Sequence, residues 1–248
     1  MTVWWRWPLD VGRKHLAGIL AAVAVVVLVQ FGLLENLEHW SLDQLFEWRG
    51  PRKPTLDVVI VTIDESTVVE LNEQWPFPRA IHAELLRKLA EGRPRVIGMD
   101  IMFDLPSSRG AADDEALGAA VAAAGNVVLG AAIADDIQPF YTRRTLNPPI
   151  SVIRRGAAGI APLNMPADAD NQVRRVPLWA ALDTERLPTL DVQLHALLAK
   201  AGVRVAPLPD RDSILINFRG GPRTYPWVSY YRVVRGEIPA EYWRDKVV

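Results

Sequence analysis

The stretch 57–106 constrains the fold more than any other part of the chain. It begins with an apolar, largely β-branched run at 58–63, and such a run bounded by polar residues is typical of a strand buried on both faces. A helical pattern follows at 81–89 and ends before Gly92, and a second apolar strand is predicted at 95–103. Strand, helix and strand form a βαβ unit, which is right-handed and makes the two strands parallel.

Two aspartates stand near the ends of these strands. Asp64 follows the first strand and Asp100 lies in the second, so both are expected toward the carboxyl edge of the sheet, where open α/β sheets place their ligands. They would be about 5 Å apart on neighbouring strands, or about 10 Å apart with one strand between them. Carboxylates this close share a proton, hold a cation or pair with arginine, for which Arg79 is available. The alternative is that both aspartates only accept hydrogen bonds from loop amides.

The pattern after this unit predicts a doubly wound half-domain. Asp113 and Asp114 stand in the first turn of a helix that ends at Gly125, and a third buried strand follows at 126–133. Strands and helices alternating in this way form a parallel βαβαβ core. Residues 135–149, rich in polar side chains and prolines, are expected to form a long surface loop.

The remaining segments are expected to add antiparallel strands and a helix to this core. A hairpin is predicted from 157–163 and 173–182, a helix over 189–201 and a strand at 214–218. The chain stops soon after Arg244 as if entering another strand, so a truncated C-terminus is expected. The predicted fold class is α/β, a three-layer-like mixed sheet with a parallel βαβαβ core and added antiparallel strands, preceded by one N-terminal transmembrane helix.

Residues 16–34 contain no charged side chain, and Gln30 is their one polar side chain. An apolar run of this length spans the ~30 Å hydrocarbon core of a bilayer as a helix. Basic residues precede the run and acidic residues follow it, which puts the N-terminus in the cytoplasm and the bulk of the chain outside. A cleaved signal peptide is the alternative, although the segment after the run lacks an A-x-A-like cleavage site.

These observations divide the chain into four parts. Residues 1–15 are expected to be a cytoplasmic N-terminus and 16–34 a transmembrane helix that acts as a signal anchor. Residues 35–56 are expected to be a juxtamembrane helix and linker, and 57–248 an extracytoplasmic domain.

Composition and motifs exclude several classes of function. A net charge of −1 gives no reason to expect a nucleic-acid partner. The absence of cysteine excludes disulfides, thiolate metal sites and cysteine nucleophiles. The sequence contains no Walker-type loop, no G-x-G-x-x-G, no G-x-S-x-G and no H-E-x-x-H. The sequence therefore has no strong catalytic motif, and no cofactor is predicted.

Further candidate residues are acidic or basic. Glu65 and Asp104 extend the acidic group at the sheet edge, and such a set of carboxylates is able to bind Mg²⁺ or Ca²⁺. Arg174 and Arg175 lie between an acidic loop and an apolar strand, and guanidinium groups suit bidentate binding of carboxylate or phosphate. Trp75 opens the W-P-F-P-R loop that leads to Arg79.

With these residues in view, the sequence over about 40–248 resembles the CHASE2 family. The resemblance rests on motifs in a specific order: I-D-E-S, W-P-F-P-R, M-D-I-M-F, L-N…D-A-D-N-Q-V-R-R-V-P-L, F-R-G-G-P…Y-P…V-S-Y and W-R-D-K-V-V. It implies an extracytoplasmic sensory domain of a bacterial transmembrane receptor, with no enzymatic activity of its own. The receptor is expected in the inner membrane with the domain in the periplasm. The candidate ligand-binding residues are Asp64, Glu65, Trp75, Arg79, Asp100, Asp104, Arg174 and Arg175.

The resemblance also implies partners. A small-molecule ligand, the membrane, a homodimeric partner and a cytoplasmic output domain such as an adenylate or guanylate cyclase or a kinase are expected. The sequence contains neither a second apolar span nor an output domain, which departs from the family layout. Two alternatives stay open: a membrane-anchored, metal-dependent hydrolase that uses Asp64 and Asp100, and a structural module for dimerisation.

Overall fold

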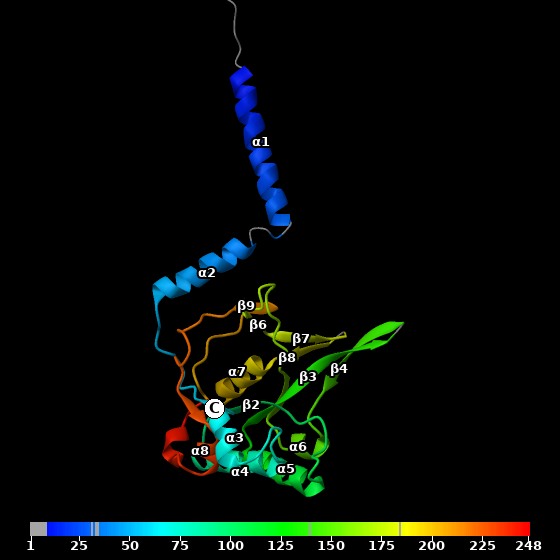
Figure 1. The fold of residues 1–248 in the computed structure, drawn as a ribbon, viewed down its shortest axis with the longest axis vertical. Coiled ribbons are helices and arrows are strands. Elements are labelled where there is room, and N and C mark those ends of the chain that lie inside the picture. Colours follow the sequence, from blue (N-terminus) through cyan, green and yellow to red (C-terminus); the bar gives the residue numbers. More distant parts are fainter. Residues whose placement is uncertain (1–8, 31, 33–34, 139, 184) are drawn as a thin grey trace, which may run out of the picture. The chain divides into compact units, whose positions relative to one another are not determined.

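The computed structural model describes residues 9–248 except 31, 33, 34, 139 and 184 (Figure 1). The chain divides into two units, Met1–Arg52 and Lys53–Val248. Each unit is described by itself.

The first unit contains two helices. α1 spans Leu9–Gln30, and α2 spans Glu35–Arg49, inside the segment 35–56 where a helix and linker are expected. Within the part of the chain that the structure describes, no helix is both long enough and apolar enough to cross a membrane. The predicted span 16–34 includes residues 31, 33 and 34, which lie outside the described residues.

The centre of the second unit is a set of parallel strands. β1 (Ile60–Thr62) pairs with β10 (Trp227–Ser229). β3 (Val127–Gln138) lies between β2 (Ile97–Met102) and β5 (Gly159–Pro162) and pairs with both. All three pairings are parallel, so the predicted parallel arrangement of the second and third strands is confirmed.

The last residues of the chain join the two halves of this sheet. Val247 forms parallel bridges with Val58, just before β1, and with Val96, just before β2. The amide of Val248 donates to the carbonyl oxygen of Val96 at 3.1 Å. The segment 246–248 therefore lies between β1 and β2, which is the more widely spaced of the two arrangements that the sequence allowed.

Helices cover both faces of the sheet. Figure 1 shows α4 and α5 on one face and α7 on the other, so the predicted three layers are present in the second unit. The helices of this unit and their bounds are α3 (Glu65–Leu71), α4 (Arg79–Glu91), α5 (Ala111–Ala124), α6 (Ser151–Arg154), α7 (Leu190–Lys200), α8 (Tyr230–Val234) and the 3₁₀ helix η1 (Ala240–Trp243).

Alternate residues of the strands face the two helical layers. Met99 and Leu129 belong to the apolar core shared with α4 and α5, whereas Val128 packs in a second cluster with residues of α7. At Gly98 an added Cβ would lie 3.1 Å from Cδ1 of Leu194, so α7 packs closely on β2 because this residue has no side chain. The two-residue period explains why these strands are almost continuously apolar in sequence.

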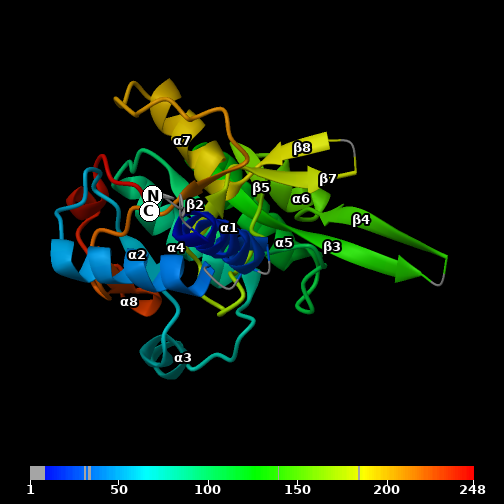
Figure 2. The same ribbon diagram turned by 90° about the horizontal axis from the view of Figure 1, so that it is seen from above.

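The prediction of a long surface loop at 135–149 is wrong. β3 continues to Gln138 and forms an antiparallel hairpin with β4 (Tyr141–Asn147), which projects from the side of the unit (Figure 2). Polar residues dominate these arms because both faces of the hairpin are far from the apolar core. Asp135 and Arg144 lie directly opposite each other in the register and form an ion pair at 3.2 Å.

The prediction that 157–163 and 173–182 pair as a hairpin is also wrong. The first segment forms β5, which is buried beside β3. The second segment contains two strands that pair elsewhere: β6 (Arg175–Pro177) with β9 (Ser213–Leu215), and β7 (Trp179–Leu182) with β8 (Glu185–Pro188). Sequence proximity favours a hairpin, but burial of β5 on the sheet outweighs it.

Candidate functional site

Asp64 is the N-cap of α3. Its Oδ1 accepts hydrogen bonds from the amide of Thr67 at 2.8 Å and from the hydroxyl of Thr67 at 2.7 Å, while Oδ2 accepts one from the hydroxyl of Ser229 at 2.6 Å. Burial raises the pKa of Asp64, but these hydrogen bonds outweigh burial and hold the pKa below its ordinary value. Both carboxylate oxygens are thus engaged by protein groups. Glu65, the first residue of α3, is exposed.

Asp113 caps a helix other than its own. α4 begins after Pro78, which makes no side-chain capping hydrogen bond. Instead Oδ2 of Asp113, on α5, accepts from the amide of Arg79 at 2.8 Å, and Oδ1 accepts from the amide of Ala80 at 2.7 Å. The hydroxyl of Ser107 donates to the same carboxylate at 2.5 Å. Burial raises the pKa of Asp113, but these hydrogen bonds together hold it below its ordinary value.

The guanidinium group of Arg79 packs inside this region. Its Cζ lies 4.6 Å from the centre of the Phe103 ring, and its Nε lies 3.7 Å from Oδ1 of Asp114. The Arg79 side chain is 12% exposed and that of Asp114 is 5% exposed, so the pair is largely shielded from water. Among the described residues, no hydrogen bond or ion pair connects Arg79 with Asp64 or Asp100.

The W-P-F-P-R motif and Phe103, which follows β2, build an aromatic cluster around the buried His82, with Trp75 at its exposed edge. His82 contacts the rings of Trp75, Phe77 and Phe103 at centroid distances between 5.4 and 6.2 Å. Its Nδ1 is hydrogen-bonded to the hydroxyl of Tyr230 at 2.7 Å. Burial, together with the positive charge of Arg79, lowers the pKa of His82 to about 4. His82 is therefore neutral at physiological pH and packs as a core residue.

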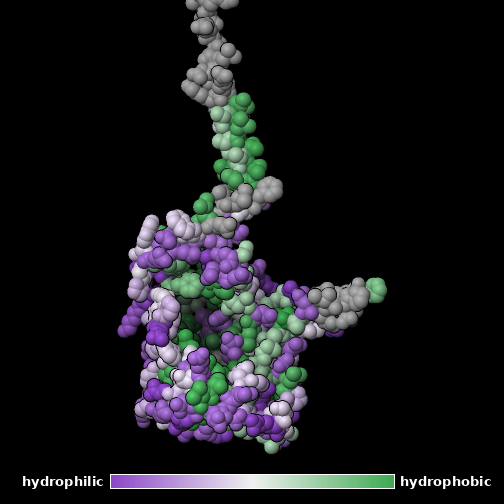
Figure 3. Space-filling model, in the orientation of Figure 1, coloured by the Kyte–Doolittle hydropathy of each residue, from purple (hydrophilic) through white to green (hydrophobic). Residues whose placement is uncertain are grey.

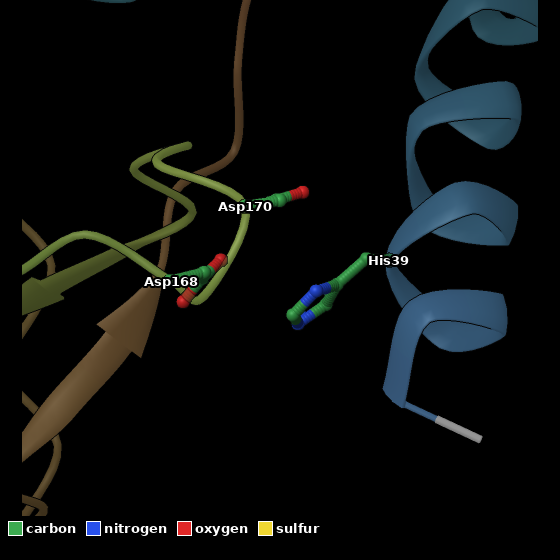
Figure 4. Close-up of side chains that lie close together, drawn as sticks. All are labelled: His39, Asp168 and Asp170. Atoms are coloured by element: carbon green, nitrogen blue, oxygen red, sulfur yellow. The ribbon is translucent and has the colours of Figure 1, made fainter. Parts of the chain in front are cut away.

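Arg174 is neutralised by the acidic loop before β6. Its Nη1 lies 3.1 Å from Oδ2 of Asp168 and 2.9 Å from Oδ2 of Asp170, and its side chain is only 7% exposed. Figure 4 shows the two aspartates on this loop. The neighbouring Arg175, the first residue of β6, is exposed.

Of the site residues predicted from the sequence, Asp100 lines two cavities. One cavity of about 440 Å³ lies between β1 and β2 next to Val248, and a second of about 260 Å³ extends from Asp100 to Thr189 and Asp191 at the start of α7. Burial raises the pKa of Asp191 above its ordinary value. The other seven predicted site residues line neither cavity, and Asp104 is half-buried after β2.

Asp64 and Asp100 do not form a metal cluster with other side chains. They stand on either side of segment 246–248, and Asp64 already has its partners. Among the described residues, neither belongs to a group of three or more histidine, aspartate or glutamate side chains close enough to share one ion.

A larger cavity, which is named the arginine pocket, lies next to β1 and β10. It has a volume of about 620 Å³, and the strands β1 and β10 and the loop after β9 form its walls. Figure 3 shows that this unit is hollowed on the face turned to the viewer, with apolar residues inside a polar rim. The lining residues are Ile60, Thr62, Ile216, Asn217, Phe218, Arg219, Gly220, Gly221, Pro222, Arg223, Thr224, Tyr225 and Trp227.

Arg219 and Arg223 are absent from the predicted site residues because the F-R-G-G-P segment predicts only a turn. One signal for them was present: the stretch 213–227 contains two arginines, three aromatic residues and no acidic residue. For Asp191 no signal was available, since a carboxylate in the first turn of a helix is explained by the helix dipole alone.

Comparison with known proteins agrees with the motif order. The profile of the CHASE2 domain matches residues 20–248, nearly the whole chain. Neither the curated proteins nor the solved structures contain a match to the chain. With a match of this extent, the chain belongs to the CHASE2 domain family, a family of extracytoplasmic sensory domains.

Proposed function

We propose that this protein is the ligand-sensing part of a membrane-anchored bacterial receptor and performs no catalysis itself. The observation that carries the proposal is the match to the CHASE2 domain over residues 20–248. The geometry supports it, because two charged residues of the motifs have structural roles: Asp64 caps a helix, and Arg174 forms ion pairs. A hydrolase that uses Asp64 and Asp100 would need at least one of them to share a substrate or metal with further side chains.

The proposed anchor is the apolar segment 16–34, with the N-terminus in the cytoplasm and residues 57–248 in the periplasm. Support comes from the uncharged sequence of this segment and from the distribution of charge on either side of it. The described part of the segment is helical, and its large apolar side chains from Leu16 to Val29 are exposed within the structure. An exposed apolar surface of this extent is typical of a contact with a membrane or another protein.

Ligand binding would be coupled to an output in the cytoplasm, such as a cyclase or a kinase, most simply in a homodimer. A ligand shifts a receptor between two states only to the extent that it binds one state more tightly. Asp100 is the predicted residue best placed to contact a ligand at the sheet edge, since it lines two cavities there.

Orientation is tested with cysteine substitutions, because the natural chain has no cysteine that would react. Gly202→Cys places a thiol at an exposed turn after α7, where no atom lies within 4 Å of the new Cβ. In cells with a permeabilised outer membrane, a membrane-impermeant maleimide is expected to label Gly202→Cys. The matched variant Thr2→Cys is expected to react only after the inner membrane is broken. Labelling of Thr2→Cys alone in unbroken cells overturns the proposed orientation.

A further inference from the structure

The arginine pocket has walls of two kinds. One wall is the face of β1 and β10 that carries Ile60 and Trp227, and the other is the loop between β9 and β10. Helix α7 packs against β2, β3 and β5. The side chains of Ile60 and Trp227, on β1 and β10, are 47% and 41% exposed. Apolar side chains at the floor of a concave surface are typical of small-molecule sites, and about 620 Å³ is within the size range of such sites.

The charged side chains that line this pocket are all positive. Arg219 and Arg223 are the only charged residues among those that line it. Arg219 is half-buried, and among the described residues it has no hydrogen bond or ion pair to a carboxylate. The guanidinium of Arg223 lies 5.4 Å from the centre of the Trp227 ring, a cation–π contact that leaves its donors available.

Arg223 is also held in an uncommon backbone conformation. Its φ angle is +67°, in the left-handed region that residues with a side chain seldom adopt. Glycines occupy positions 220 and 221 of the same turn, yet the positive φ falls on arginine. Strain of this kind at a non-glycine residue is often retained where the side chain has a function.

We infer that the arginine pocket binds a small organic anion, with a carboxylate or phosphate group between Arg219 and Arg223 and an apolar body against Ile60 and Trp227. Guanidinium groups bind these anions with paired hydrogen bonds, and the apolar wall favours a ligand larger than an inorganic ion. This inference rests on the proposed sensory function and names the class of ligand that the receptor detects. The ligand site then lies over the paired strands β1 and β10.

The test measures binding to the full chain in detergent micelles by isothermal titration and by thermal shift. The probes are phenylacetate, phenyl phosphate, hexanoate and hexyl phosphate at concentrations up to the millimolar range. The comparison compounds are phenylacetamide, which lacks the charge, and inorganic phosphate, which lacks the apolar body. At least one organic anion is expected to bind and raise the melting temperature, and the two comparison compounds are expected to have no effect.

Variants assign the effect to the pocket. Arg219→Gln and Arg223→Gln are each expected to weaken binding about tenfold or more, because each removes a charge-assisted hydrogen bond. Trp227→Ala is expected to weaken the aromatic anions more than hexanoate. Arg204→Gln, an exposed arginine outside the pocket, is the matched control and is expected to bind as the natural chain does.

Three outcomes overturn the inference: no binding by any of the four anions, equal binding of phenylacetamide, or unchanged binding in Arg219→Gln. These outcomes are distinct from a failure of the proposed function. If cysteine labelling confirms the periplasmic orientation while the anions fail to bind, the receptor proposal stands and the ligand site lies elsewhere. If the labelling fails and the anions bind, the pocket stands without the receptor.

Discussion

The hydroxyl oxygen of Tyr230 lies 2.7 Å from Nδ1 of His82, and both side chains are buried in the core between α4, α8 and the sheet. Tyr230 belongs to the V-S-Y motif near the end of the chain, while His82 follows the W-P-F-P-R motif near its beginning. One hydrogen bond thus ties together two motifs that are far apart in sequence. Burial raises the pKa of Tyr230 well above its ordinary value, so the hydroxyl keeps its proton.

The buried histidine makes stability depend on pH. Its pKa falls from 6.5 to about 4 in the folded state, first because of burial and then because of the Arg79 charge. The unfolded chain therefore binds a proton more readily, and the stability from neutral His82 is complete above pH 6.5 and lost as the pH falls toward 4. A shift of this size corresponds to about 3 kcal/mol, measured by urea unfolding across this range.

Other groups titrate in the same range, so the natural chain is compared with His82→Gln. Carboxylates contribute equally to both proteins and cancel in the difference. The free energy of unfolding of the variant is expected to change less between pH 6.5 and 4. Parallel pH curves for the two proteins would show that His82 is protonated as readily when folded as when unfolded.

Asp113→Ala is expected to destabilise the second unit by about 1–2 kcal/mol, since the amides of Arg79 and Ala80 lose their capping carboxylate. Glu115→Ala, an exposed change in the same turn of α5, is the control and is expected to change the unfolding free energy by less than about 0.5 kcal/mol. Equal effects of the two changes would indicate that the charge near the α5 N-terminus matters, and not the cap of α4.

Arg174→Ala and Arg175→Ala compare the contribution of a buried arginine to stability with that of an exposed one. Loss of Arg174 leaves Asp168 and Asp170 without its charge, which costs about 2 kcal/mol. The cost is below that of a fully buried pair because the Asp170 side chain is 39% exposed and water screens it. Arg175→Ala is expected to change the unfolding free energy by less than about 0.5 kcal/mol. Denaturant unfolding of both variants measures the difference, and a larger effect at Arg175 contradicts it.

Gly118→Ala tests the contact between α5 and α6. The new Cβ would lie 2.4 Å from the carbonyl oxygen of Val152, a backbone atom that moves only if α6 moves. Alanine favours a helix over glycine by about 1 kcal/mol, but overpacking of this kind costs about 1–3 kcal/mol. A net loss of stability is expected from thermal unfolding, whereas Gly221→Ala, with no atom within 4 Å of its Cβ, is expected to be neutral. A gain at Gly118 would indicate that α6 shifts easily.

The parallel core was predictable because its signal is local. The apolar runs of β2 and β3 and the helix between them have the periods of a buried strand and a helix, and the structure has them in the expected order. The position of Val247 between β1 and β2 was not predictable. A pairing between residues so distant in the chain leaves no periodic pattern in either segment.

The hydrogen-bond partners of the motif residues were also not predictable, because they come from distant parts of the chain. The sequence places Asp64 at the end of a strand, but only the fold brings Ser229 to its second oxygen. The acidic first turn at Asp113 follows from the helix dipole, yet its hydrogen bonds to the start of α4 require the two helices to meet. Likewise Arg219 and Arg223 line a pocket only because the fold brings their loop next to β1.

The insertion of segment 246–248 into the middle of the sheet sets the order of folding. During synthesis the two strands on either side of it leave the ribosome early, but the residues that bridge them leave much later. The contacts that close the sheet therefore have a large sequence separation, and neither half is able to close against the other until this segment has been made. Closure of the sheet is expected to be a late step of folding, and loss of segment 246–248 is expected to leave the facing edges of β1 and β2 unpaired and open to proteolysis.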